Sequence, residues 1–196
     1  MTLEIGAFVQ TDNSPLAARL VKLTGSIAII EIAGQREAAP VTSLSLPPNF
    51  TVRSGDLLMA PTQYIAHQCN CVSHNVAGLA AVIFTKWPDA NVYRDRNSRL
   101  NHKHLFGNYT LHGRVVNLYT QLYPGKATPR QDSSQNRLAA FQTSLDLLAK
   151  LPGIPSVAFP YGIGCGLAGG HWPDYLFVLT RWAHWNKDIS ITLFRK

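Results

Sequence analysis

Six residues with polar or reactive side chains stand in one short stretch of the chain, YIAHQCNCVSHNVAGLAAVIF at residues 64–84. They are His67, Cys69, Asn70, Cys71, His74 and Asn75, and an apolar run follows them directly. Residue types in this pattern could form a metal site, a Cys–His nucleophile or a nucleotide cradle. The choice between these chemistries depends on spacing and on the elements that position the side chains.

The spacing of the two cysteines argues against a metal site. Cys69 and Cys71 are separated by one residue, whereas zinc motifs place about two to four residues between paired cysteines. No second pair of matching spacing occurs in the chain. Strand periodicity places Cys69 and Cys71 on the same face as His67, and Gln68 and Asn70 on the other. We therefore expect the two cysteines to be small buried thiols, and we expect no metal and no cofactor.

A second stretch, PYGIGCGLAGGH at residues 160–171, is rich in glycine. Its glycines are not followed by Gly-Lys-Ser/Thr, so it is not a Walker loop. Cys165 lies within it, but the sequence identifies no positive neighbour that would make this thiol a reactive thiolate. Glycine allows backbone N–H groups to approach an anion closely, although an ordinary turn would also use it.

The residues from 51 onward alternate between expected strands and helices. The expected strands are 64–70, 114–123, 156–164 and 190–194, and the expected helices are 78–87, 137–151 and 172–185. This alternation predicts a largely parallel α/β sheet, whose ligands bind at the carboxyl ends of the strands. Both stretches described above follow a strand and precede a helix, so together they would suit a diphosphate.

The first 46 residues follow a different pattern. Four short runs rich in Val and Ile, the last of them at residues 39–46, are separated by Gly and Pro. They predict a compact β-barrel or meander, similar to an SH3 or Tudor module. Two consecutive prolines then interrupt any ladder. We therefore expect a β module at 1–46, a linker at 47–50 and a second domain at 51–196.

Composition narrows the class of partner. The chain has 18 Lys and Arg against 11 Asp and Glu, a net charge of +7, which favours anionic partners such as nucleotides or nucleic acid. The basic residues are dispersed, so a dedicated nucleic-acid stripe is not indicated. Three cysteines argue against a disulfide framework, and neither a leader nor a membrane span is expected. These features predict a cytoplasmic protein.

Taken together and in this order, the two stretches resemble the macrodomain family of ADP-ribose binders. The resemblance covers residues 51–196. It implies a three-layer α/β/α macrodomain with a mixed, mostly parallel sheet, to which the small N-terminal β-barrel-like module is added.

The resemblance implies a set of ligand-binding residues. Gly55-Asp56-Leu57 stands where the family has an aspartate that contacts adenine, and His67–Asn70 stands where it has an Asn-Ala-Ala-Asn segment. Phe194 occupies the place of an aromatic residue that stacks on adenine. The implied ADP-ribose contacts are Asp56, Leu57, Asn70, Val76, Ala77, Gly78, Gly164, Cys165, Gly166, Leu167, Ala168, Gly169 and Phe194.

Within the family, HQCNC followed by GLA is similar to the yeast ADP-ribose-1″-phosphate phosphatase branch, in which a histidine at the position of His67 is implicated in catalysis. Branches that use lysine or aspartate have them where this chain has Gln121, Ala168 and Ala77. Lysine chemistry is therefore not expected. His67 is the expected catalytic residue, because imidazole titrates near neutral pH. A core histidine is the alternative interpretation, with His74 and His171 as other candidates.

We therefore expect a hydrolase that binds ADP-ribose and cleaves a bond at its 1″ carbon, acting as an ADP-ribose-1″-phosphate phosphatase or as an enzyme that removes ADP-ribose from a macromolecule. Two alternatives share these residues. The protein could be a non-catalytic ADP-ribose reader, or a binding module whose main partner is nucleic acid, contacted through the basic surface. No membrane partner is expected.

Overall fold

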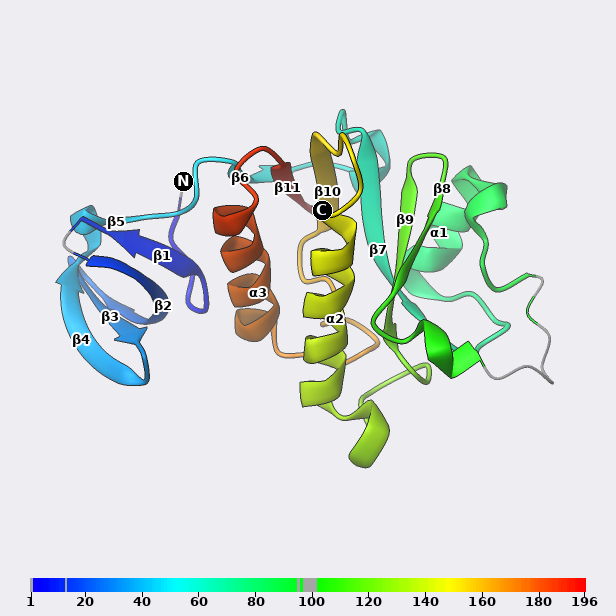
Figure 1. Ribbon diagram of the computed structural model, residues 1–196, viewed down its shortest axis with the longest axis horizontal. Helices are drawn as coiled ribbons and strands as arrows, with labels where there is room; N and C mark the ends of the chain where they lie inside the picture. Colours follow the sequence, from blue (N-terminus) through cyan, green and yellow to red (C-terminus); the bar gives the residue numbers. More distant parts are fainter. Residues whose placement is uncertain (1, 13, 95, 97–101) are drawn as a thin grey trace.

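The computed structural model describes residues 2–12, 14–94, 96 and 102–196, without the side chains of 14–17. It contains two sheets, and helix α3 (Trp172–Trp185) lies between the N-terminal one and the rest of the chain (Figure 1). The strands of the N-terminal sheet are β1 (Phe8–Thr11), β2 (Ser14–Thr24), β3 (Ile27–Ile32), β4 (Gln35–Pro40) and β5 (Leu44–Ser45).

The N-terminal sheet is antiparallel and open, in the order β4-β3-β2-β1-β5. The expected barrel-like module is therefore not shown, whereas the alternative, a meander, agrees with the consecutive order of β1 to β4. Its two edges cannot close on each other, because β5 has only two residues and β4 carries the mostly exposed sequence QREAAP. The expected strand at 39–46 is likewise broken by a 3₁₀ turn at Val41–Ser43, which follows Pro40.

The second sheet has the order β6-β11-β10-β7-β9-β8. Its strands are β6 (Phe50–Ser54), β7 (Tyr64–Asn70), β8 (Tyr109–His112), β9 (Val115–Gln121), β10 (Ser156–Pro160) and β11 (Ser190–Arg195). All neighbouring strands are parallel except β8 and β9. The prediction of a mixed, mostly parallel sheet is confirmed.

Helices cover both faces of the second sheet. Helix α1 (Gly78–Lys86) packs on one face, and α2 (Ser134–Leu148) and α3 pack on the other (Figure 1). Helix α2 begins at Ser134, because the Ser133 hydroxyl caps it by accepting from the Asn136 N–H at 3.1 Å. The result is the expected three-layer α/β/α arrangement.

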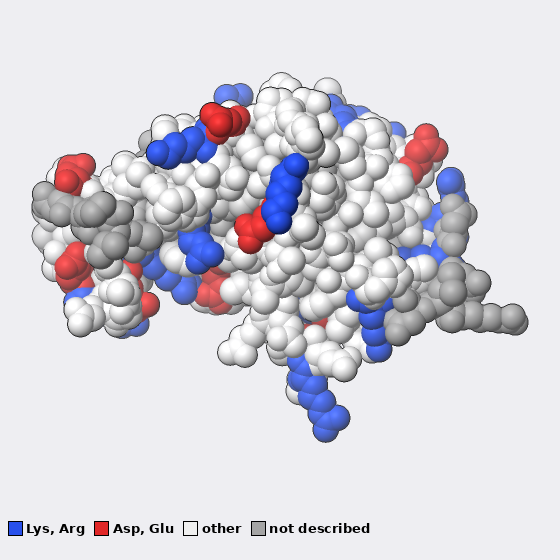
Figure 2. All heavy atoms as spheres, viewed as in Figure 1, with Lys and Arg blue, Asp and Glu red and all other residues white. Residues whose placement is uncertain are grey.

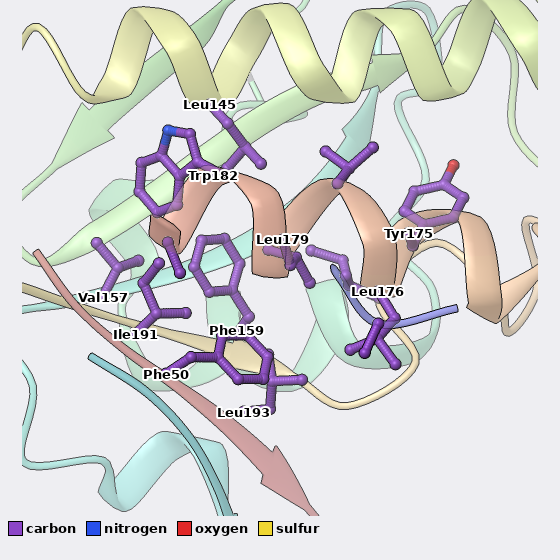
Figure 3. Close-up of a cluster of buried hydrophobic side chains, with 14 of the residues drawn as sticks. Phe50, Leu145, Val157, Phe159, Tyr175, Leu176, Leu179, Trp182, Ile191 and Leu193 are labelled. Carbon is purple, nitrogen blue, oxygen red and sulfur yellow. The ribbon is translucent and has the colours of Figure 1, made fainter. Parts of the chain in front are cut away.

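The main core lies under α2 and α3. Trp182 and Leu179 of α3 point onto the sheet, where they meet side chains of β10 and β11 (Figure 3). The rings of Phe159 and Trp182 pack edge to face at 6.2 Å between centroids. Burying large apolar side chains in this way is the main favourable contribution to folding.

The N-terminal sheet packs against α3. The Phe8 N–H donates to the Thr180 hydroxyl at 2.7 Å, and Arg19 forms an ion pair with Asp174 at 2.5 Å. Gly6, with φ +94, crosses the start of α3 so closely that a Cβ would lie 2.4 Å from Pro173. The two sheets therefore share α3 as a common layer.

The surface gives no contiguous basic stripe on the face shown in Figure 2, where Lys and Arg side chains are scattered. Of the helices within the described ranges, none is both long and apolar enough to cross a membrane.

Candidate ligand-binding site

A pocket of about 400 Å³ opens at the carboxyl ends of β7, β9 and β10. Its lining residues come from four segments of the chain, within 67–70, 75–80, 121–125 and 160–168, together with Tyr93. The two polar and glycine-rich stretches of the sequence thus meet at one edge of the sheet. This is where a parallel sheet places its ligand.

Asn70 shapes the loop that follows β7. Its side-chain oxygen accepts from the N–H groups of Val72 at 3.1 Å and Ser73 at 2.7 Å, and its amide nitrogen donates to the Tyr93 hydroxyl at 3.1 Å. The register of β7 against β9 shifts between Cys69 and Asn70. This irregularity turns Asn70 toward Tyr93, on the α1 side of the sheet, and not onto the face of Gln68 as expected.

Arg96 closes the same loop from outside. Its guanidinium donates to the carbonyls of Asn70 at 2.6 Å and Ser73 at 2.9 Å, and lies 4.3 Å from the centroid of the Tyr93 ring. Tyr93 also lines the pocket. Sequence reasoning missed both residues, because neither belongs to a motif or a recognisable spacing.

The first turn of α1 forms one wall of the pocket. Its N-cap residue, Ala77, makes no side-chain cap, so the N–H groups of this turn are left for another acceptor. Gly78 has φ +56, and a Cβ there would lie 3.3 Å from Leu167. The glycine therefore lets the second loop approach α1 across the pocket.

Internal hydrogen bonds hold the loop after β10. Cys165, Gly169 and Gly170 donate to the carbonyls of Gly162, Gly166 and Gly164, at distances from 2.9 to 3.0 Å. In the described part of the chain, the backbone N–H groups of Gly166, Leu167 and Ala168 have no protein acceptor. Consecutive free N–H groups of this kind form an anion-binding concavity.

A buried ion pair ties this loop to α2. Arg137 and Asp132 pair with 2% and 1% of their side chains exposed. Arg137 also donates to the carbonyls of Gly125 at 2.7 Å and Ala168 at 3.3 Å, which lie on two different pocket walls. The pair therefore fixes the distance between those walls.

His67 lies in the floor of the pocket and is 1% exposed. It is paired in register with Asn117 of β9, and its Nε2 lies 2.7 Å from the Asn117 Oδ1. The Asn117 amide nitrogen donates to the Ala90 carbonyl at 3.2 Å, so its oxygen faces the histidine and accepts from Nε2–H. Nδ1 then carries the lone pair.

Burial lowers the pKa of His67 to about 4, although the hydrogen bond to Asn117 opposes this shift. The ring is therefore neutral at pH 7. Cys69 and Cys71 are fully buried, which confirms the expectation of core thiols, and burial raises the pKa of each to about 12. The described residues contain no group of three or more His, Cys, Asp or Glu able to hold a metal ion.

A second cluster adjoins the pocket at β11. The Asp56 carboxylate accepts from the Leu58 N–H at 3.0 Å, which caps the short helix Leu57–Met59. The ring of Phe194 lies next to Gly55. The backbone carbonyl of Phe194 accepts from the Tyr161 N–H at 2.8 Å. Leu57 and Phe194 pack in one apolar cluster with Leu79, which lines the pocket, so this cluster adjoins it.

The structure thus brings together part of the expected site. The expected residues that line the pocket are His67, Asn70, Ala77, Gly78, Gly164, Gly166, Leu167 and Ala168; those that do not are Asp56, Leu57, Val76, Cys165, Gly169 and Phe194. His171 is exposed and contacts Asp174 at 3.2 Å, and neither it nor His74 lines the pocket. Lining residues outside the expected set include Gln68, Asn75, Tyr93, Gln121, Gly125 and Tyr161.

No protein-family model matches the chain, and no curated protein does. Solved structures do match. The macrodomain of Mycobacterium tuberculosis DarG is 22% identical, with 75% of this chain and 97% of that chain covered and a TM-score of 0.55. The Oceanobacillus iheyensis macrodomain is 20% identical, with 75% and 84% covered and a TM-score of 0.50. A Trypanosoma brucei macrodomain in complex with ADP is 16% identical, with 74% and 63% covered and a TM-score of 0.50. The chain therefore has a macrodomain fold.

Proposed function

We propose that this protein binds ADP-ribose in the pocket at the carboxyl ends of β7, β9 and β10. The observation that carries this proposal is the convergence of two donor sets on one pocket of about 400 Å³. One set is the uncapped first turn of α1, and the other is the free N–H groups of Gly166, Leu167 and Ala168. Both suit the oxygens of a diphosphate. The fold agrees, since one similar macrodomain was solved with ADP.

The proposed orientation follows from the two ends of the pocket. The cluster of Asp56, Leu57 and Phe194, which adjoins the lining residue Leu79, would take the adenine, with the aromatic ring for stacking and the carboxylate for the amine. The distal ribose would lie toward Asn70 and His67. Val76, Cys165 and Gly169 would contribute only through the backbone of their loops.

We propose further that the protein hydrolyses a bond at the 1″ carbon, as in the yeast ADP-ribose-1″-phosphate phosphatase branch. Water would attack C1″, the C1″–O bond would break, and the leaving oxygen would keep its electron pair. His67 Nδ1 would take the proton from the water; burial keeps the ring neutral at pH 7, and its pKa of about 4 makes it a weaker base than a free imidazole. In the described part of the chain no lysine lines the pocket, so a covalent lysine adduct is not proposed.

The burial of His67 also favours a second function, that of a non-catalytic reader of ADP-ribose. A ring that is 1% exposed and bonded to Asn117 is what a structural histidine would show. The reader would use the same diphosphate contacts. Nucleic-acid contact has no support in the scattered basic surface of Figure 2. The cytoplasmic location and the division into 1–46, 47–50 and 51–196 stay predictions.

Phosphate release from ADP-ribose-1″-phosphate separates these two functions. The experiment compares the wild type with His67→Gln, which keeps a donor for the Asn117 oxygen but removes the imidazole base. We expect His67→Gln to bind ADP-ribose and to lose about a hundredfold in rate, the lower range for a general base. Full release by this variant would overturn the role of His67. A wild type that binds but turns over neither this ester nor ADP-ribosylated macromolecules would favour the reader.

A further inference from the structure

One wall of the pocket is held by a residue from the far N-terminus. The Tyr161 hydroxyl donates to the Glu4 carboxylate at 2.5 Å, although the two residues are 157 positions apart. Tyr161 directly follows β10 and lines the pocket, whereas Glu4 precedes β1 of the N-terminal sheet. The N-terminal segment therefore reaches the ligand pocket through one side chain.

Glu4 is also bonded to the two residues that flank the Tyr161 ring. Arg195 donates to its other carboxylate oxygen at 2.8 Å, and the Arg195 guanidinium lies 3.9 Å from the ring centroid. The ring of Trp172 lies 4.7 Å from Tyr161 and its indole N–H donates to Glu4 at 3.5 Å. One carboxylate thus fixes the hydroxyl, the cation and the aromatic neighbour of Tyr161.

The backbone holds Glu4 in this position. Gly6 passes the start of α3 with a φ of +94, and its approach to Pro173 leaves no room for a Cβ. The Gly6 N–H donates to the Leu20 carbonyl at 2.7 Å, and the Ala7 N–H donates back to the Glu4 carbonyl at 3.0 Å. The Glu4 side chain is 27% exposed. Its geometry therefore depends on the docking of the N-terminal sheet against α3.

We infer that Glu4 is a positioning residue for the pocket, and that through Tyr161 the N-terminal segment sets the affinity for the ligand. The inference rests on the proposed binding of ADP-ribose. Burial and the Glu4 carboxylate raise the pKa of Tyr161, which keeps its hydroxyl a donor.

Calorimetric titration of the full chain with ADP-ribose, and with ADP, tests the inference. The variants are Glu4→Gln, Tyr161→Phe and the double change. We expect each single variant to weaken both ligands about tenfold, because Tyr161 loses the hydrogen bond that holds it in the pocket wall. The double variant is expected to be no weaker than either single one, because the two side chains act through one contact. The matched control is Glu31→Gln in the N-terminal sheet. It removes an exposed ion pair of 3.2 Å between Glu31 and Arg36. The affinity of this variant for both ligands should stay at the wild-type value.

Thermal unfolding of the same variants distinguishes positioning from plain stability. A Glu4→Gln protein with a lower Tm and wild-type affinity for both ligands would overturn the inference while the proposed function stands. Additive losses in the double variant would overturn it as well. A folded wild type that binds neither ligand would overturn the proposed function, and the inference with it.

Discussion

Replacing Asp132 by Asn should destabilise the protein far more than an ordinary polar change. The Asp132 carboxylate accepts from the N–H groups of Leu122 at 3.0 Å and Tyr123 at 3.2 Å, and twice from Arg137. A neutral amide in place of this carboxylate could not compensate the charge of Arg137, whose side chain is 2% exposed. Breaking a buried pair from one side costs about 3–5 kcal/mol, because it leaves an uncompensated charge. This is a large share of the roughly 5–15 kcal/mol that stabilises a typical domain.

Urea unfolding at pH 7 measures this loss. The matched control is Asp146→Asn on helix α2, because Asp146 accepts from Gln142 at 2.8 Å in an exposed position. The control should change the free energy of unfolding by less than about 0.5 kcal/mol. If Asp132→Asn cost no more than about 1 kcal/mol, or no more than the control, the ion pair would not hold the pocket walls as argued.

Three further outcomes follow from the structure. Gly164→Ala should lower both Tm and ligand affinity, because φ is +78 and the new Cβ would lie 2.5 Å from Tyr175; Gly162→Ala, with φ +75 and nothing within 4 Å, should cost less. His67→Gln should make the free energy of unfolding less sensitive to acid. The pKa of His67 is about 4 in the folded state and 6.5 in the unfolded state, so the unfolded state binds more protons as the pH falls. The wild type should therefore lose about 3 kcal/mol of unfolding free energy between pH 7 and pH 4 through this residue. A urea series over that range checks it, and equal losses in both proteins would contradict the shift. Glu4→Gln and Tyr161→Phe should each weaken the binding of ADP-ribose and ADP, as measured by the calorimetric titrations described above.

Periodic elements could be predicted from the sequence, and irregular ones could not. Strand β7 and helix α3 have the expected bounds, because a mostly buried run marks the strand and an apolar face marks the helix. Strand β8, with only four residues at a sheet edge, carries too little pattern to be recognised. The barrel expectation failed because short Val- and Ile-rich runs indicate strands but do not show whether the two sheet edges meet.

The candidate site divides in the same way. The loops of Gly78 and Gly164 were found because glycines after a strand indicate close backbone approach. Arg137 and Glu4 were missed because their contacts join residues distant in sequence, such as Ala168 and Tyr161, and no local spacing records such pairings. Long-range polar contacts of this kind need the fold before they can be read.

Calorimetric titration of the wild-type chain decides whether the pocket binds ADP-ribose. We predict saturable binding of one ADP-ribose per chain, competed by ADP and weakened by Gly164→Ala. A chain that shows a cooperative thermal transition but no saturable heat with ADP-ribose would contradict the proposed function.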